Sequence, residues 1–512
     1  MKSGGVSYEI VKTRRGTDTL IVSDGAKEYP LHSKVNPERD ADLFRGRFDP
    51  SRYDLLIVLG IGLGYHLLPL GDEGEGFRQI VLIDILDGIG DGISRNSLTS
   101  FLMDDPRVTL LAGKSVTEVE RFLDGAMDME RIRGVSVLEH PASMRIFASY
   151  YGEIRTAIER LIAVKAGNRA TREAFGGLYL RNILKNIRLL GRMRPVSALF
   201  GANRACPAII IGSGPSLDRD IPRLKKHRER ACLVAVDSAL PALLQSGIRP
   251  DIVISIDPQP YCAEHFLNCD LGGAVTVFSI SAGTAVMEKY GGYVSLTSHP
   301  FAQLADRVYG GSIGSIDSST GSVAGDAVSL CLKCGFRAVG LVGIDFSFSD
   351  YRIYARGTAN QRRYAAYFQD RFTTVEGSNA RYILTASGGL RFEGKFTRKS
   401  FRHYQQALES FIVSGGSGGV YSLNPRGLAL RGVPLMDFGE FIETFSGAGA
   451  GTCGFPVTAS TTAARIDPGP LVDALNSAPD RDLIDELLRA SLGEGTPAGK
   501  LTRYRRMIRA LA

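Results

Sequence analysis

Short runs of uninterrupted apolar residues recur along this chain, and stretches with helical spacing separate most of them. Such runs are typical of strands buried on both faces of a sheet, and helical stretches between them are typical of βαβ units. The runs form two groups, at 55–59, 80–83, 108–111 and 135–138, and at 208–211, 233–236, 252–256, 275–280, 294–296 and 338–342. The sequence therefore predicts an α/β fold with two Rossmann-like parallel-sheet domains in tandem, a helical connector and a helical C-terminal region.

The pattern around these two groups sets the expected domain boundaries. Residues 150–164 and 179–190 have helical spacing, and Pro195 follows them. We expect an N-terminal Rossmann-like domain at 1–140, a helical connector at 141–200, a central α/β domain at 201–400 and a helical region at 401–512. Within the last region, the Gly, Ala, Thr and Pro content near 447–470 is typical of a linker.

Composition and charge narrow the class of protein. The chain has 512 residues, 44% of them hydrophobic and 22% charged, which is ordinary for a globular protein. The net charge of +7 comes without a dense basic stripe interleaved with aromatic residues, so we expect no nucleic-acid partner. No run of about 18 apolar residues occurs, so we expect no membrane span. The 7 scattered cysteines predict reduced thiols in the cytoplasm, and we interpret Cys331 and Cys334 as buried structural thiols.

The sharpest local motif follows the first run of the second group. There the chain reads Gly212-Ser213-Gly214-Pro215-Ser216, and a helix is expected next. The glycines allow close backbone approach and unusual φ, and proline suits a first helical turn. Free N–H groups at the helix start, with the Ser216 hydroxyl, would hold a phosphate. A tight strand-to-helix turn without a ligand is the simpler alternative.

Three aspartates end or follow predicted strands of the second group. They are Asp237, Asp257 and Asp345. Ligands of open α/β sheets bind beyond the carboxyl ends of the strands, so we expect Asp237 and Asp257 to face one cleft. There they would accept hydrogen bonds from sugar hydroxyls or a base amine, or hold a divalent cation. A helix cap or turn is the commoner use of one such aspartate.

The first group carries its own glycine motif. Gly60-x-Gly62-x-Gly64 is followed twenty residues later by Asp84, a pattern that suggests a dinucleotide or methyl-donor site. However, the third glycine comes one position early, and the bulky His66 follows. We therefore predict a structural Rossmann-like domain, used for partner docking, rather than a cofactor site.

Several of these motifs together resemble a known family. The turn at 212–218, the segment 247–251 before Asp257, and residues 343–345 with 354–358 look like the motility-associated factor (Maf) glycosyltransferases of bacteria. They are also similar to the bacterial sialyltransferases that use CMP-sialic acid. Residues 56–66 look like the Maf N-terminal domain, and Asn182 and Asn186 in the connector fit Maf proteins too.

The resemblance implies that 201–400 is a sialyltransferase-like catalytic domain with a donor site. Ser213 falls where the sialyltransferases have a donor-contacting Asn, and Ser216 matches their phosphate-side Ser. Asp237 and Asp257 fall where they have Asn. Because a carboxylate repels phosphate, we place both at the ribose or base, or on a cation. Thr320, Gly321 and Ser322 align with a cytidine-side loop.

The resemblance also suggests catalytic residues. Tyr354 lies near the position of a tyrosine that contacts the leaving phosphate, and Asp345 ends the matching strand. The catalytic histidine of the sialyltransferases has no secure match here. His403 is the candidate, although it lies much farther along the chain than their spacing suggests.

The implied function is an inverting transfer of a pseudaminic- or legionaminic-type nonulosonic acid from a CMP-activated donor onto Ser/Thr of flagellin. We expect no cofactor and no metal, because a CMP-sugar carries one phosphate and not a diphosphate. A Mg²⁺-dependent pterin pyrophosphokinase, with Asp237, Asp257 and Asp345 as ligands, is one alternative. A non-catalytic chaperone or scaffold that binds flagellin is the other.

Overall fold

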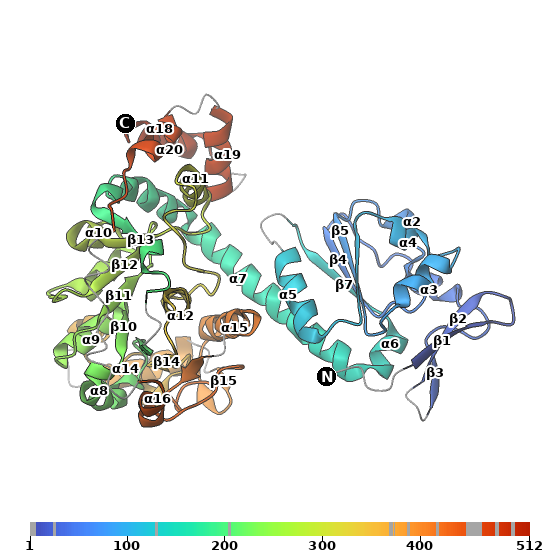
Figure 1. Cartoon of the computed structure of the whole chain (residues 1–512), viewed down its shortest axis with the longest axis horizontal. Helices are drawn as coiled ribbons and strands as arrows, with labels where there is room; N and C mark the ends of the chain where they lie inside the picture. Colours follow the sequence, from blue (N-terminus) through green and yellow to red (C-terminus); the bar gives the residue numbers. More distant parts are fainter. Residues whose placement is uncertain are drawn as a thin grey trace. The chain divides into compact units, whose positions relative to one another are not determined.

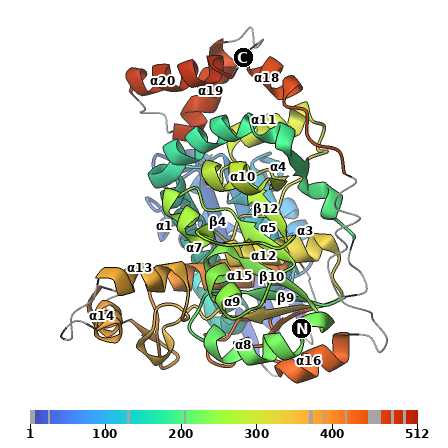
Figure 2. The ribbon, with the colours of Figure 1, turned by 90° about the vertical axis from the view of Figure 1, so that its left-hand side faces the viewer.

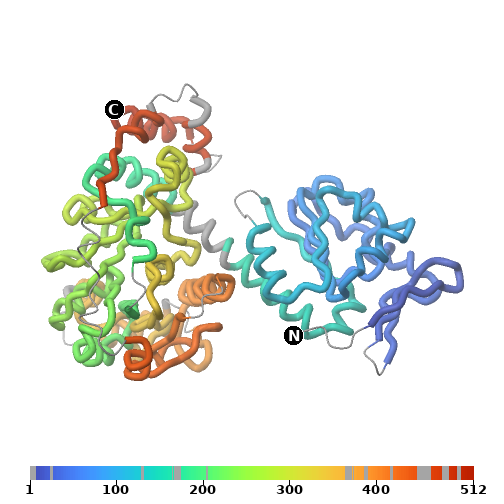
Figure 3. Tube along the Cα trace, viewed as in Figure 1, coloured from blue at the N-terminus to red at the C-terminus, as the bar shows by residue number. Residues whose placement is uncertain are grey.

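The computed structural model describes residues 7–23, 27–127, 132–202, 206–367, 372, 374–386, 390–415, 419–446, 463–476, 481–492 and 497–511 (Figure 3). The chain divides into two compact units, Met1–Arg169 and Ala170–Ala512, each with its own parallel sheet (Figure 1). The predicted α/β fold class with tandem Rossmann-like sheets is confirmed. The boundary falls inside helix α7 (Ala148–Ile187), within the segment where we expected a helical connector.

The parallel sheet of unit 1 has the strand order β6-β5-β4-β7. Its strands are β4 (Leu55–Leu59), β5 (Gln79–Asp84), β6 (Val108–Ala112) and β7 (Val135–Glu139). The helices are α1 (Arg39–Asp42), α2 (Leu70–Glu73), α3 (Ile89–Arg95), α4 (Phe101–Asp104), α5 (Val116–Ala126) and α6 (Pro141–Ile146). Helix α5 begins with a capping box, in which Ser115 and Glu118 satisfy each other's backbone N–H groups.

The start of the described chain forms a small antiparallel sheet. It contains β1 (Ser7–Lys12), β2 (Asp18–Ser23) and β3 (Glu28–Pro30), in that order. Leu20 and Val22 alternate with more exposed residues and pack into the core of unit 1. The two-residue alternation therefore places one face of this sheet against the parallel sheet domain.

Unit 2 contains an eight-stranded parallel sheet with the order β17-β14-β9-β10-β11-β12-β13-β8. The strands are β8 (Met193–Pro195), β9 (Ala208–Ile211), β10 (Cys232–Val236), β11 (Ile252–Ser255), β12 (Val275–Ser279), β13 (Gly292–Ser295), β14 (Val339–Val342) and β17 (Val420–Ser422). A two-stranded hairpin, β15 (Arg391–Phe392) and β16 (Lys395–Phe396), lies outside this sheet. The central strands are buried throughout, as their uninterrupted apolar sequences predict.

Unit 2 also contains the described helices that follow β9 along the chain. They are α8 (Leu217–Lys226), α9 (Leu240–Gln245), α10 (Thr284–Tyr290), α11 (Pro300–Val308), α12 (Val323–Cys334), α13 (Ala359–Tyr367), α14 (Val375–Arg381), α15 (Lys399–Ser414), α16 (Phe438–Phe445), α18 (Gly469–Asn476), α19 (Arg481–Leu492) and α20 (Ala498–Arg509). Helix α12 packs against β9, β10, β11 and β14, and Figure 2 gives a second view of it with β9 and β10. It ends at Gly335, whose φ of 80° suits a glycine cap.

Two short strands of the eight-stranded sheet were not among the predicted ones, nor was the β15–β16 hairpin. Strand β8 extends the sheet beside β13. Strand β17 extends it beside β14 and lies within 401–512, the region that we expected to be helical. Both have three residues, and β8 includes Arg194 and Pro195. Strands this short, at the edges of a sheet, lack the apolar run that marks a buried strand.

The prediction that all cysteines are reduced thiols is wrong for Cys206, which is disulfide-bonded. Scattered positions in a sequence do not reveal which sulfurs become neighbours in the fold. The other described cysteines are free, and Cys331 and Cys334 are buried in α12, as expected.

The C-terminal part of α7 holds the loops of this sheet in place. The Asn182 side-chain amide donates to the carbonyls of Pro258 (2.8 Å) and Ser281 (3.1 Å). The Asn186 amide donates to the carbonyls of Ile280 (2.8 Å) and Ala282 (2.9 Å). Both asparagines are buried, so these bonds satisfy backbone groups that water cannot reach. They fix the chain just after β11 and β12.

We expect Asn186→Ala to lower the free energy of unfolding by about 1–3 kcal/mol, because it leaves two buried carbonyl groups unsatisfied. Urea unfolding measures this change. Lys185→Ala, one position away on the exposed face of the same helix, is the control and should change stability little. Equal effects of the two substitutions would show that the amide bonds do not hold these loops.

Candidate functional site

The strand order of unit 2 locates the expected binding edge. From β9 the sheet grows through β10, β11, β12 and β13, and β14 then returns to the other side of β9. Ligands of open α/β sheets bind at such a reversal, beyond the carboxyl ends of the strands. The glycine turn after β9 and the segment 343–345 after β14 meet there.

A carboxylate occupies the glycine turn at this reversal. Ser216 donates from its backbone N–H to Asp345 Oδ2 (2.9 Å) and from its hydroxyl to Oδ1 (2.5 Å). The Asn424 side-chain amide also donates to Asp345 Oδ1 (2.6 Å). Asp345 is only 3% exposed, and its burial raises its pKa to about 6. The groups of Ser216 that we expected to hold a phosphate therefore bind a side chain of the protein.

The two glycines of the turn are needed for space. The Gly214 N–H donates to the Gly343 carbonyl (2.8 Å), and a Cβ on Gly212 would lie 2.5 Å from the same oxygen. A Cβ on Gly214 would lie 2.7 Å from it. We expected an unusual φ at Gly212 and Gly214, and this is wrong because neither has a positive φ. Gly343, which faces them, has a positive φ of 66°. The next residue, Pro215, is buried in the turn before α8 and lies outside the first helical turn where we expected it.

Asp237 and Asp257 lie together at the next strand ends. Asp237 is buried, and it accepts hydrogen bonds from the Ser255 hydroxyl (2.6 Å) and the Ser238 N–H (2.7 Å). Asp257 is half-buried and accepts from the Gln259 N–H (2.9 Å). Burial raises the pKa of Asp257, and the charge of Asp237 raises it further. The structure thus places the two carboxylates at one edge of the sheet.

The loop after Asp257 brings in two side chains that the sequence interpretation missed. It forms the 3₁₀ helix η6 (Pro260–Phe266), which carries Cys262 and His265. His265 Nδ1 lies 3.5 Å from Asp237 Oδ1, and one ligand atom each of Asp237, Cys262 and His265 lies within 4.8 Å of the others. All three residues are buried. The only sequence signal was a Cys-x-x-His spacing directly after a strand-end aspartate.

Hydroxyl groups line the same edge toward β9. The Ser238 hydroxyl donates to the Ser213 hydroxyl (2.9 Å), and the Ala355 N–H donates to the Ser213 carbonyl (2.9 Å). Tyr354 therefore lies beside the glycine turn, and it packs on Phe348, Ile353 and Ile383. Burial raises the pKa of Tyr261, and the charge of Asp257 raises it further.

The predicted cytidine-side loop caps helix α12. Ser322 accepts from the Gly325 N–H (3.2 Å), Thr320 is buried, and Gly321 is exposed with a φ of 65°. Because α12 precedes β14 and packs on β9 and β10, its first turn lies toward the carboxyl ends of the strands. Asp326 follows this loop on α12, and we had not singled it out from the sequence. Its carboxyl group is buried, and burial raises its pKa.

The structure places His403 on α15, outside the group formed by Asp237, Cys262 and His265. It is half-buried, and burial lowers its pKa. Helix α15 also carries Phe401, which packs on the cluster that Tyr354 joins.

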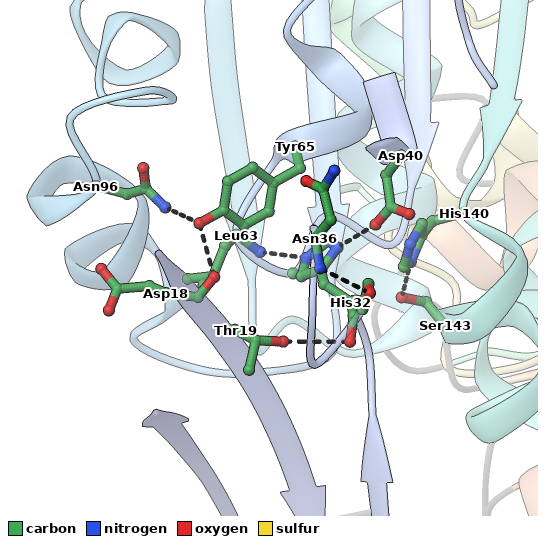
Figure 4. Close-up of polar contacts among 12 residues, drawn as sticks. Asp18, Thr19, His32, Asn36, Asp40, Leu63, Tyr65, Asn96, His140 and Ser143 are labelled. Carbon is green, nitrogen blue, oxygen red and sulfur yellow. Dashed lines mark hydrogen bonds and ion pairs between the residues drawn. The ribbon is translucent and has the colours of Figure 1, made fainter. Parts of the chain in front are cut away.

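The glycine motif of unit 1 is likewise filled by side chains. Asp84 Oδ2 accepts the N–H groups of Ile61 (2.7 Å) and Gly62 (3.1 Å). His32 Nε2 accepts that of Leu63 (2.8 Å), as Figure 4 shows. A Cβ on Gly62 would lie 2.4 Å from His32 Nε2. These amides are the ones that a dinucleotide would need, so the motif does not fit a cofactor held at this loop.

A histidine group lies beside this loop. His32, Asp40 and His140 have ligand atoms within 4.8 Å of one another, a spacing that a metal ion could bridge. However, His32 Nε2 already accepts from Leu63, so a neutral ring carries its proton on Nδ1 and donates it to Asp40 (2.9 Å). The ring then has no lone pair left for a metal, and we interpret the group as structural.

Comparisons with known proteins agree with this architecture. Residues 181–351 match the sequence profile of a family described as 6-hydroxymethylpterin diphosphokinase MptE-like. An uncharacterized protein of Treponema pallidum (strain Nichols) is 41% identical over 85 residues, which cover 17% of this chain and 40% of that protein. A second one is 28% identical over 230 residues, covering 43% of this chain and 74% of that protein. The chain thus spans less than half the length of the first of these relatives.

A solved structure extends the likeness over both units. It is the Maf glycosyltransferase from Magnetospirillum magneticum AMB-1, with a TM-score of 0.54 and 15% identity, covering 98% of this chain and 89% of that one. This chain therefore has the fold of that glycosyltransferase. Among the described helices, none has both the length and the apolar character that a membrane span requires.

We expect Asp345 to make the protein less stable as the pH rises from about 4 to about 6. Its pKa is raised from 3.8 to about 6, so the folded state holds this proton more tightly than the unfolded chain does. The linked stabilisation is present below pH 4 and lost by pH 6, and it amounts to about 3 kcal/mol. In urea unfolding at several pH values, the wild type should lose this stability relative to Asp345→Asn.

Asp437→Asn is the control for that experiment. Asp437 caps α16, and backbone N–H groups lower its pKa, so its contribution is lost as the pH falls. The two variants should therefore show pH slopes of opposite sign relative to the wild type. Slopes of the same sign would contradict the protonation of Asp345.

Proposed function

We propose that this protein is a glycosyltransferase that moves a nonulosonic acid of the pseudaminic or legionaminic type from a CMP-activated donor onto Ser/Thr hydroxyls of flagellin. The observation that carries the proposal is the polar edge formed by Asp237, Asp257, Ser213 and Tyr354, on a chain that has the fold of a Maf glycosyltransferase over 98% of its length. A sugar with many hydroxyls and two anionic groups needs such a mixture of acceptors and donors.

The donor phosphate would lie at the hydroxyl groups beside β9. Ser216 binds Asp345, so we assign the phosphate to Ser213, Ser238 and the Tyr354 hydroxyl. The cytidine would lie toward Thr320 and Ser322, at the start of α12. Asp237 and Asp257 would then face the sugar, where carboxylates accept hydrogen bonds from its hydroxyls.

The transfer breaks the bond between the anomeric carbon and the phosphate oxygen, and CMP leaves with the electron pair. The acceptor oxygen bonds to the opposite face of that carbon, which inverts it. The acceptor proton needs a base, and Asp257 is suited to this because it is half-buried and burial raises its pKa. We therefore assign proton uptake to Asp257.

A pyrophosphokinase is the second candidate, because residues 181–351 match the MptE-like profile. Its Mg²⁺ would need several carboxylates around one ion. Asp345 is occupied by Ser216 and Asn424, so it does not join Asp237 and Asp257. This separation favours the glycosyltransferase.

Calorimetry distinguishes these functions. We expect the full-length protein to bind CMP, with no comparable binding of ATP and Mg²⁺, and to add one nonulosonic acid mass to purified flagellin in the presence of the CMP-sugar. Preferential binding of ATP with Mg²⁺ would favour the pyrophosphokinase. Binding of flagellin with neither nucleotide would favour a chaperone or scaffold.

We expect Tyr354→Phe to lower kcat for transfer by about 10²-fold, because it removes a hydroxyl donor to the leaving phosphate. Its affinity for CMP should change much less. Tyr351→Phe, at an exposed position three residues earlier, is the matched control and should transfer sugar at the wild-type rate. A Tyr354→Phe enzyme with unchanged kcat would remove this tyrosine from the phosphate site.

A further inference from the structure

Three different metal-ligand types converge at the end of β10. A carboxylate oxygen of Asp237, the sulfur of Cys262 and a ring nitrogen of His265 lie within 4.8 Å of one another. Cys262 and His265 are three residues apart on η6, where the 3₁₀ geometry places positions i and i+3 on one face. Two separate elements of the chain thus supply one compact group.

The histidine of this group has no hydrogen-bond partner. Both ring nitrogens of His265 are buried without one among the residues that the structure describes, and the side chain is 4% exposed. A buried imidazole normally satisfies both nitrogens, so this ring is poised for a ligand atom. The hydroxyl group of a sugar acceptor cannot reach a nitrogen enclosed in this way. A small ion held among the three side chains can reach it.

The charges of the neighbouring residues also favour a bound cation. Asp237 is 2% exposed, and the half-buried Asp257 lies beside it. In the described part of the chain, neither carboxylate forms an ion pair with a lysine or arginine, and the Asp237 oxygens accept from neutral serine donors. Nearby Arg363 pairs with Glu264. Buried carboxylates without a cationic partner are costly, and a divalent cation would offset them.

We propose that Asp237, Cys262 and His265 bind a zinc ion. A thiolate, an imidazole and a carboxylate together suit zinc, and three protein ligands leave a further coordination position open. The Ser255 hydroxyl and the Ser238 N–H already orient the Asp237 carboxylate, as supporting groups do in metal sites. On binding, the Cys262 thiol gives up its proton to solvent.

The contrast with His32 of unit 1 supports the choice. His32 Nε2 accepts from the Leu63 N–H, whereas among the described residues neither nitrogen of His265 takes part in a hydrogen bond. From the sequence we expected no metal, because a CMP-sugar carries one phosphate, and we did not bring Asp237 together with Cys262 and His265.

Zinc would also change the electrostatic interaction between this edge and an anionic donor. This step rests on the proposed function: the CMP-sugar carries a phosphate and a carboxylate, which Asp237 and Asp257 would repel. A zinc ion beside them makes the local charge less negative, and the anionic donor is then tolerated next to the acidic strand ends.

Metal content and spectroscopy test the site in the full-length protein. After EDTA treatment and removal of the chelator, we expect the wild type to take up one zinc per chain, measured by mass spectrometry of the metal. Cobalt in place of zinc should give the near-ultraviolet absorption of a thiolate-to-cobalt charge transfer. Cys262→Ser should lose this absorption, and His265→Gln should weaken zinc binding by at least about tenfold.

Two variants serve as matched controls. Cys269→Ser changes a thiol seven residues further on, and Cys331→Ser changes a buried thiol of the Cys-x-x-Cys pair in α12. Both should keep the zinc and the cobalt absorption. A wild type that takes up no stoichiometric zinc would overturn the proposal, and so would an unchanged cobalt absorption in Cys262→Ser.

Thermal unfolding shows whether a variant that has lost zinc binding is still folded. Zinc should raise the Tm of the metal-free wild type and should leave that of His265→Gln nearly unchanged. His265→Cys, which restores a ligand of another kind, should recover zinc binding. If it does not, while His265→Gln still folds, the assignment of His265 is wrong.

These measurements need no sugar donor, so they separate this proposal from the proposed function. Sugar transfer by a protein that binds no zinc would refute the metal site alone. Zinc binding by a protein that binds no CMP would refute the transferase alone.

Discussion

In both sheets, an aspartate at the end of one strand accepts the amide hydrogens of the glycine turn that follows the neighbouring strand. Asp84 does so for Ile61 and Gly62, and Asp345 does so for Ser216. The amides at such a turn attract an anion, and here the protein supplies its own. In unit 2 the turn is thus occupied at Ser216, and we place the candidate site farther along the carboxyl edge, at the ends of β10 and β11. The closed turns are thus a structural constraint that moves the candidate site.

That edge is fixed from behind by α7. The Asn182 amide holds the Pro258 carbonyl, one residue after Asp257, so the loop that carries Cys262 and His265 starts from a defined position. On the other side, Ser238 reaches Ser213 beside the glycine turn. The polar groups of the edge are therefore held by hydrogen bonds on both sides, which limits the positions that they can adopt.

Much of this could be predicted from the sequence, and the exceptions have physical reasons. The strands 55–59 and 208–211 were predicted with their observed ends, because an uninterrupted apolar run marks a strand buried on both faces. Strands β8 and β17 are too short to show such a run. Asp237 and Asp257 were found because strand ends share an edge, whereas His265 lies on a short 3₁₀ helix, where no periodicity reveals which way a side chain points. The occupation of Ser216 by Asp345 depends on the packing of two turns that are far apart in the sequence, and no local motif contains that information.

The two histidine groups show how counting lone pairs separates sites that look alike. A neutral imidazole has one N–H and one lone pair. His32 uses both, on Asp40 and on the Leu63 amide, so its environment is complete without a ligand. His265 uses neither in a hydrogen bond among the described residues, although it is equally buried and also lies beside an aspartate. Burial of an unsatisfied polar ring costs stability, and a fold tolerates that cost where a bound species repays it. Among the described residues of the β10–β11 edge, a buried histidine without a hydrogen-bond partner thus lies beside a buried carboxylate, and a bound cation would satisfy both groups.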